Sequence, residues 1–154
     1  MDTLEKLLTI EEIKQLKARY FRFIDTRNIS EFLNLFTADV EWIWYAEDNV
    51  TVNARYDGIV AFERHLTEIG DPLERGFTVH HGHMPEIEVV DDRNARGIWA
   101  MVDYVFVPGV MEFTGYGHYH EEYVKGDDGV WRISKSHITR LHVDYPDGVK
   151  VSAS

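Results

Sequence analysis

The sequence FTVHHGHMPEIEVVDDRNARGIWAMVDY, residues 77–104, contains the strongest structural signal in the chain. Two long runs rich in β-branched and aromatic residues lie on either side of the polar segment 91–94. Such runs around a break containing Asp and Asn predict an antiparallel β-hairpin. The first run carries His80, His81 and His83, and the second carries a carboxylate, Asp103, near its end. The hairpin therefore brings candidate acid–base residues onto adjacent strands.

The turn predicts a register for this hairpin. A two-residue turn at 92–93 and a four-residue loop over 91–94 both place His80 opposite Val105. Asp103 then lies one diagonal step from His80 on the same face, ~7–8 Å away. A β-bulge at Gly82 or Pro85 would place His81 on that face instead. We therefore expect His80 to share a face with Asp103 unless the strand contains a bulge.

Composition limits the classes of protein that the chain can represent. With 154 residues, 44% hydrophobic and 28% charged, the chain is expected to form one globular domain over 1–154, with a lead-in at 1–8 and a tail at 145–154. The net charge of -11 argues against nucleic acid or an anionic membrane surface as partner. The absence of cysteine excludes disulfides and thiolate chemistry.

The chain also lacks the sequence features of membrane and secreted proteins. No apolar run approaches the ~20 residues that a membrane span requires. The N-terminal sequence MDTLEKLL has no basic start followed by an apolar core, as a secretory signal would. We therefore expect a soluble cytoplasmic protein.

Outside the hairpin, the pattern predicts helices first and strands afterwards. The sequence TIEE at 9–12 has the form of a capping box and predicts a helix that ends near Thr26. The other expected elements are a short helix over 30–36, strands over 40–46 and 50–56, a helix over 59–69 closed by Gly70, and long strands over 111–124 and 130–143. This order predicts an α+β domain, with the helices on one side of a curved, mainly antiparallel sheet.

The strand over 95–106 is apolar on both faces. Its inner face must close against the helices. Its outer face is expected to pack on another subunit, so we expect a homo-oligomer, either a dimer or a trimer.

From about Thr9 to Val143, the chain resembles the SnoaL-like family of the nuclear transport factor 2-like superfamily. The segments that carry the resemblance are IEEIKQLKARYFRFIDTRN, FLNLFTADVEW, His80 seven residues before Ile87-Glu88-Val89, and Gly117-x-Tyr119-x-x-x-Tyr123 leading to Gly129-Val130-Trp131-Arg132-Ile133. The resemblance implies a cone-shaped α+β barrel with a mostly apolar pocket at its open end. Members include scytalone dehydratase, lindane dehydrochlorinase, ketosteroid isomerase, polyketide cyclases and a bile-acid 7α-dehydratase, together with binding-only proteins, so the fold alone does not fix the function.

The resemblance also implies a set of catalytic residues. The dehydratase members use a His–Asp pair, and His80 and Asp25 fall on those positions. The similarity to the bile-acid dehydratase adds Tyr20 and Asp103. Asp25 would fix the tautomer of His80, which would remove a proton from the substrate. A carboxylate at a helix C-terminus is disfavoured by the macrodipole, which by itself predicts a compensating partner for Asp25.

Each of these residues has a structural alternative. Asp25 could bond a neighbouring amide or arginine, Asp103 could form an ion pair with Arg140, and Tyr20 could be a core aromatic. The remaining residues expected to contact substrate, as pocket wall or as a holder of an anionic group, are Trp42, Trp44, Phe21, Met101, His118 and Arg140.

Two sets of histidines have a spacing found in metal sites. His81 and His83 lie on one strand face near Glu86, and His118 and His120 lie on another near Glu121 and Glu122. The sequence spacings from these histidines to the acidic residue and to the glycine differ from those of a cupin. The order of elements, with helices first, also differs from that of a cupin. We therefore expect no metal and no other cofactor.

Together these features predict a cofactor-independent lyase of the dehydratase type, or an isomerase. Its substrate would be a small hydrophobic cyclic molecule such as a steroid, polyketide or terpenoid. The alternative is a non-catalytic module of the same fold that binds a hydrophobic ligand or serves in assembly.

Overall fold

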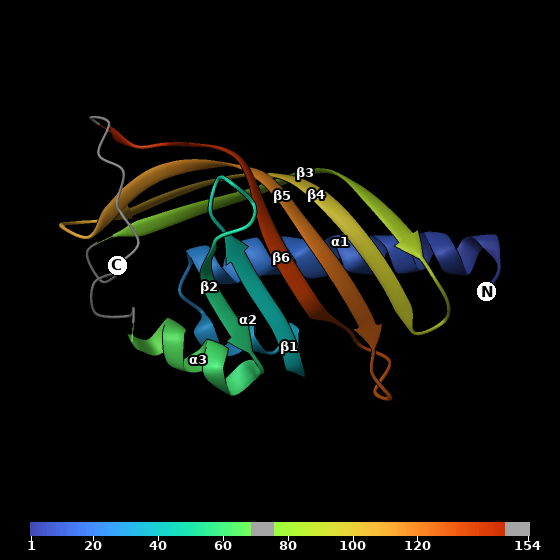
Figure 1. The fold of residues 1–154 in the computed structure, drawn as a ribbon. Coiled ribbons are helices and arrows are strands. Elements are labelled where there is room, and N and C mark those ends of the chain that lie inside the picture. The colour runs from blue at the N-terminus through green and yellow to red at the C-terminus, as the bar shows by residue number, and fades with distance from the viewer. Residues whose placement is uncertain (69–75, 147–154) are drawn as a thin grey trace.

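The computed structural model describes residues 1–68 and 76–146 (Figure 1). The expected closing residue Gly70 and most of the expected tail lie outside the described residues. The elements in chain order are α1 (Thr3–Asp25), α2 (Ile29–Leu33), β1 (Phe36–Tyr45), β2 (Val52–Asp57), α3 (Ile59–Glu68), β3 (Phe77–Val89), β4 (Asn94–Val107), β5 (Met111–Lys125) and β6 (Trp131–Asp144).

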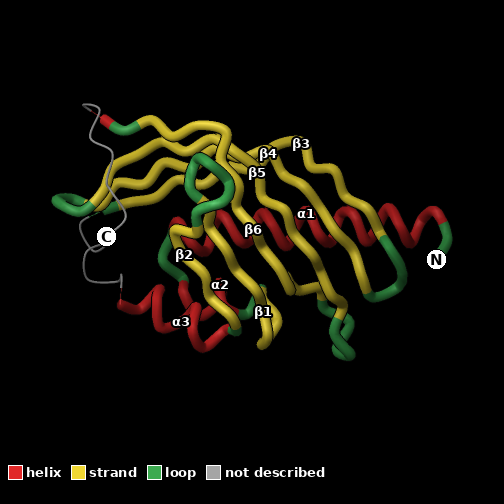
Figure 2. Tube along the Cα trace, in the orientation of Figure 1, coloured by secondary structure: helices red, strands yellow, loops and turns green. Residues whose placement is uncertain are grey.

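The described strands form one six-stranded sheet in the order β2-β1-β6-β5-β4-β3. Neighbouring strands are antiparallel except β1 and β6, which run parallel. Figure 2 shows the sheet arching over α1, while α2 and α3 lie beside β1 and β2 at one end. The predicted α+β architecture, with helices against a curved sheet, is confirmed.

The first helix begins earlier than its sequence predicted. Asp2 caps it: the backbone N–H of Glu5 donates to Asp2 Oδ1 at 2.9 Å, and the Glu5 carboxylate accepts from the Asp2 N–H at 2.6 Å. Thr9 is buried inside the helix, so the predicted start at Thr9 is wrong. The lead-in over 1–8 continues into the helix because the Asp2 capping box satisfies the N-terminal amides about two turns earlier.

The hairpin of β3 and β4 has a different register from the predicted one. The turn places Val89 opposite Ala95, which shifts the pairing by one residue from the predicted register. A bulge between His83 and Glu86 shifts it by one more residue. His80 therefore lies directly opposite Asp103, and its predicted position opposite Val105 is wrong. Because a one-residue shift reverses the faces and a second restores them, His80 remains on the inner face.

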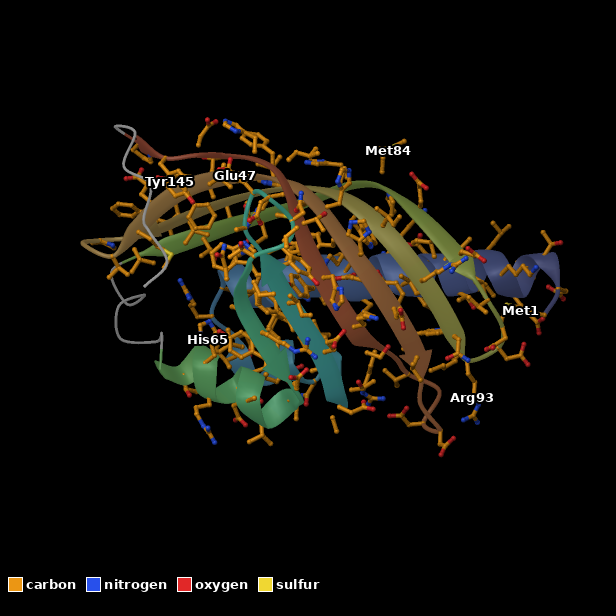
Figure 3. All side chains as sticks on the ribbon, in the orientation of Figure 1. Met1, Glu47, His65, Met84, Arg93 and Tyr145 are labelled. Atoms are coloured by element: carbon orange, nitrogen blue, oxygen red, sulfur yellow. The ribbon has the colours of Figure 1, made fainter. Side chains whose placement is uncertain are left out.

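The bulge is visible from outside the molecule. Met84 has φ 37° and its side chain is 90% exposed. In Figure 3 it projects from the side of the sheet that faces away from α1. The backbone thus absorbs the extra residue at Met84 and Pro85.

The core lies between α1 and the concave face of the sheet. Side chains on β5 alternate, so Tyr119, Glu121 and Tyr123 face α1 while His118 and His120 face outward. The buried hydrophobic residues that α1 contributes are Ile13, Leu16 and Tyr20. Within the described residues, no helix is both long enough and apolar enough to span a membrane.

Candidate functional site

A pocket of about 310 Å³ opens at the end of the cone where α1, α2 and α3 meet the sheet. Aromatic and aliphatic side chains form most of its wall, and Trp42, Trp44, Tyr56 and Phe62 are among them. The polar residues that line it are Tyr20, Arg27, Asn53, His65, Thr78, His80, Asp103, Tyr119 and Arg140. A mostly apolar cavity with a few convergent polar groups is the usual form of a small-molecule site.

Asp25 and His80 form a hydrogen-bonded pair at this pocket. Asp25 is the last residue of α1, and its Oδ1 lies 2.6 Å from His80 Nδ1. The His80 backbone N–H donates to Asp25 Oδ2 at 2.8 Å, and the Thr78 hydroxyl donates to Oδ1 at 2.9 Å. In the tautomer that carries its proton on Nδ1, the imidazole donates a hydrogen bond to the carboxylate and Nε2 is left as an acceptor. Among the described residues, none hydrogen-bonds Nε2.

The pair combines partial exposure with fixed geometry. The side chain of His80 is 15% exposed and that of Asp25 is 22% exposed, and His80 lines the pocket. Three hydrogen bonds fix the orientation of the carboxylate, and the carboxylate fixes the imidazole. An imidazole held in this way, with its free nitrogen at a cavity, has the arrangement of a general base.

Asp103 and Arg140 form a second pair in the same wall. Arg140 donates from Nη1 to Asp103 Oδ1 at 2.7 Å and from Nη2 to Oδ2 at 2.9 Å. The alternative role expected for Asp103, an ion pair with Arg140, is therefore present. The two residues lie on β4 and β6, and the strand between them carries Gly115. A Cβ at Gly115 would collide with both Arg140 Nη1 and Asp103 Oδ1, so only glycine lets Arg140 reach across β5.

Tyr20 places a phenol in the pocket wall. It is 3% exposed, and its ring packs against those of Phe32 and Tyr119 with centroids 4.9 and 5.8 Å away. Burial, reinforced by the charge of Glu121, raises the pKa of the Tyr20 phenol well above its usual range. The hydroxyl therefore stays protonated and is available as a donor.

Three predicted substrate contacts do not line the pocket. Phe21 packs behind it against Tyr20 and Tyr119. Met101 is 3% exposed in the core. His118 was expected at the pocket, but the alternation of β5 places it on the outer face, where its ring lies 6.2 Å from that of His120. The prediction for His118 is wrong because Tyr119, its neighbour, takes the inward position.

Several pocket residues were missed by the sequence reasoning. Thr78 shares the inner face with His80 at a spacing of two, so strand alternation could have identified it. Tyr119 belongs to the Gly-x-Tyr motif but was not assigned to the wall. Arg27 follows Asp25 by two residues, and it reaches the pocket from a backbone conformation that the sequence does not signal.

A second buried polar cluster lies deeper in the cone, and we call it the Lys17 network. The Lys17 ammonium lies 2.5 Å from Glu121 Oε1, and both side chains are fully enclosed. Glu121 also accepts from the hydroxyls of Tyr123, at 2.6 Å, and Ser136, at 3.1 Å, and Trp99 donates to Tyr123 at 2.9 Å. Burial lowers the pKa of Lys17 to about 8, an effect that Glu121 partly opposes.

The histidines considered for a metal site lie on the outer face. His81 and His83 are exposed and their rings stack at 6.1 Å, and His120 lies near Thr139. In the described ranges 1–68 and 76–146, no three His, Asp or Glu side chains come together in a way that could hold a metal ion.

Comparison with known proteins supplies the family and the fold. Residues 5–137 match the family described as SnoaL-like domain. A proposed scytalone dehydratase from Novosphingobium aromaticivorans is similar over 99% of this chain and 95% of its own, with 21% identity and a TM-score of 0.82. The structure named LinA is similar over 100% of this chain and 100% of its own, with 19% identity and a TM-score of 0.78.

A third solved structure has the same fold. The hexachlorocyclohexane dehydrochlorinase LinA-type3 from Novosphingobium barchaimii is 21% identical, covering 96% of this chain and 97% of its own, with a TM-score of 0.76. At these identities the likeness establishes the fold alone.

Proposed function

The chain belongs to the SnoaL-like domain family, and we propose that it is a cofactor-independent lyase of the dehydratase type, or an isomerase, that acts on a small hydrophobic cyclic substrate. The observation that carries this proposal is the His80 imidazole, held through Nδ1 by Asp25 at 2.6 Å while its Nε2 is free at an aromatic pocket. Structures named for a dehydratase and a dehydrochlorinase share the fold, and both names denote eliminations.

The reaction would begin with a proton transfer to His80. Nε2 removes a proton from a carbon next to a carbonyl or at an activated ring position. Asp25 then stabilises the imidazolium through the Nδ1 hydrogen bond, without itself taking the proton. The Thr78 hydroxyl and the His80 amide hold the carboxylate in place during this step.

Tyr20 would complete the reaction as a hydrogen-bond donor. Its raised pKa keeps the phenol protonated, so the hydroxyl can donate to a departing hydroxyl or to a developing enolate. In a dehydration, the proton taken by His80 would pass to the departing hydroxyl, which leaves as water; in an isomerisation, His80 would return the proton to another carbon. The aromatic walls of Trp42 and Trp44 exclude water and strengthen these interactions.

Asp103 and Arg140 would act on the electrostatics of the pocket. Both oxygens of Asp103 accept from Arg140, so the carboxylate is engaged by the guanidinium. In this proposal Asp103 holds Arg140, and Arg140 presents a fixed positive charge beside the reacting groups. We therefore propose a positioning role for Asp103, in place of the acid–base role that the family resemblance implied.

Replacement of the pair tests the proposal directly. A thermal-shift screen of steroids, aromatic polyketides and cyclic terpenoids first finds ligands, since a ligand of the native state raises its apparent stability. With a ligand that turns over, His80→Gln and Asp25→Asn should each lower turnover by about 10²–10⁴-fold, while affinity changes little.

The matched control is His81→Gln, which removes the neighbouring histidine from the outer face. It should leave turnover unchanged. If His80→Gln and Asp25→Asn bind and convert the ligand as the wild type does, the enzyme proposal fails. Ligand binding without turnover in any of these proteins would favour the non-catalytic binding module.

The expected homo-oligomer and cytoplasmic location stay predictions. We propose that the outer face of the sheet forms the subunit contact, because Ile98 and Leu141 are 39% and 73% exposed there. Light scattering of the purified chain measures the oligomeric state.

A further inference from the structure

Arg27 adopts a backbone conformation that usually belongs to glycine. It lies just past the end of α1 with φ 60°. The Arg27 N–H donates to the Ile24 carbonyl at 3.3 Å, and the Asn28 N–H donates to the Phe23 carbonyl at 2.9 Å. These bonds form a Schellman motif, in which the left-handed position is normally occupied by glycine because other residues are strained there. A strained arginine at this position calls for an explanation in its side chain.

The guanidinium of Arg27 has a donor without an acceptor. Arg27 lines the pocket, and its Nη2 is buried with no hydrogen-bond partner among residues 1–68 and 76–146. A buried donor left unpaired is costly and rare in native structures. The chain has 27 acidic residues and a net charge of -11, yet no described carboxylate pairs with this atom.

Neighbouring charges do not satisfy Arg27. Asp25 is the acidic residue whose charge acts on its pKa, which burial lowers and Asp25 raises. The oxygens of Asp25 already accept from Thr78 and His80. Arg140, the other arginine of the pocket, gives both Nη atoms to Asp103. Only Nε of Arg140 is left unpaired, so among the described residues Arg27 is the pocket arginine with an unpaired Nη atom for a ligand.

We propose that Arg27 is a specificity-determining residue that binds a carboxylate on the substrate, whose cyclic body lies against the aromatic walls. This inference rests on the proposed function, since it names the substrate class of the same pocket. A guanidinium matches a carboxylate in charge and in planar geometry, and the charge-assisted hydrogen bonds are stronger than neutral ones. The substrate class becomes small cyclic carboxylic acids.

Two probes with the same body and different head groups test the assignment. 2-Naphthoate carries the carboxylate, and 2-naphthamide replaces it with a neutral amide of similar shape. Binding can be followed by quenching of tryptophan fluorescence, because Trp42 and Trp44 line the pocket. The wild type should bind 2-naphthoate about 10–100-fold more tightly than 2-naphthamide, as expected for charge-assisted hydrogen bonds.

Arg27→Gly separates the ligand-binding role of the side chain from a structural one. Glycine suits the left-handed backbone, so the melting temperature should equal or exceed that of the wild type. The preference for 2-naphthoate should disappear, while the affinity for 2-naphthamide stays the same. Arg27→Lys, which keeps the charge, should retain part of the preference. Arg19→Gln, which removes a charge from the exposed face of α1, should retain all of it.

Equal or undetectable binding of the two probes by the wild type overturns the assignment, and so does a preference that survives in Arg27→Gly. His80→Gln should keep the preference, because His80 acts on the reacting carbon and not on the carboxylate. If Arg27 sets the preference but His80→Gln turns over as the wild type does, the proposed reaction fails and the carboxylate site stands. If turnover depends on His80 but no carboxylate preference exists, the proposed reaction stands and the carboxylate site fails.

Discussion

The Lys17–Glu121 pair and the Asp25–His80 pair both join α1 to the sheet, and they differ in what remains unsatisfied once each pair has formed. In the Lys17 network, Glu121 accepts from Lys17, Tyr123 and Ser136, and the ammonium also lies over the ring of Tyr119, 3.5 Å from its centroid. In the Asp25–His80 pair, the carboxylate is fully used but Nε2 of the imidazole is free at the pocket.

The comparison identifies the structural feature that separates the pair we propose to be catalytic from the Lys17 network. The Lys17 network is fully enclosed and has the lowered lysine pKa, whereas the Asp25–His80 pair is partly exposed. Depth of burial and a shifted pKa would therefore select the Lys17 network and not the pair that we propose to be catalytic. A free atom at a cavity selects the Asp25–His80 pair, and Tyr20 connects the two regions, since Lys17 lies over its ring while Tyr20 itself lines the pocket.

Removal of Lys17 should give the largest effect on stability. Lys17→Met leaves Glu121 as an unpaired buried carboxylate and should lower the free energy of unfolding by about 3–5 kcal/mol. Lys14→Met, which removes an exposed lysine from the same helix, is the control and should change little. Urea denaturation measures both. A loss below about 1 kcal/mol for Lys17→Met would mean that the pair is not essential for stability.

The same variants separate the two regions by activity. The folded fraction of Lys17→Met should turn substrate over nearly as the wild type does, whereas Asp25→Asn should lose turnover. The double variant Lys17→Met/Glu121→Gln should recover much of the lost stability, because the neutral amide can still accept from Tyr123 and Ser136.

The sequence predicted which face of an element points inward, but it did not predict which residues far apart in the chain come into contact. The hairpin pattern placed His80 on the same face as Asp103, and the family resemblance added Tyr20 and paired Asp25 with His80. Lys17, in contrast, would be assigned to the surface from its residue type, since lysine is rarely buried unless paired. Its partner Glu121 lies 104 positions away on β5, a contact that local patterns do not contain.

The register shows the same limit at shorter range. Both the turn and the bulge at Met84 shift β3 by one residue, and each depends on backbone angles that the sequence only suggests. The prediction that His80 faces the pocket survived because the two shifts cancel. Arg27 could not be found in this way, because a positive φ at an arginine has no sequence signature.

A methyl group added to β5 should perturb the pocket and leave the Lys17 network intact. In Gly115→Ala the new Cβ collides with the Asp103–Arg140 pair, so the pair must shift, at a cost of about 1–3 kcal/mol in the free energy of unfolding. We also expect weaker ligand binding, because both residues line the pocket. Thermal melting and ligand titration measure the two effects.

Gly97→Ala is the matched substitution for the other region. Its Cβ would lie 3.2 Å from the ring of Tyr123, a member of the Lys17 network, and the ring can move by a few tenths of an ångström. It should therefore cost less stability than Gly115→Ala and leave ligand binding unchanged. A larger loss for Gly97→Ala would show that the Lys17 network is the more tightly constrained of the two regions.

The smallest expected effect is the pH dependence that Lys17 adds to stability. Its pKa is 10.5 in the unfolded chain and about 8 in the folded protein, so between these values the unfolded state binds more protons. The contribution of Lys17 to the free energy of unfolding therefore increases as the pH rises through this window, and below pH 8 its full cost is present. Relative to Lys17→Met, which cannot titrate at this position, the wild type should gain about 1 kcal/mol between pH 8 and pH 9. Urea denaturation of both proteins at these two pH values measures the difference, and a constant difference would mean that Lys17 stays charged inside the cone and that Glu121 fully compensates its burial.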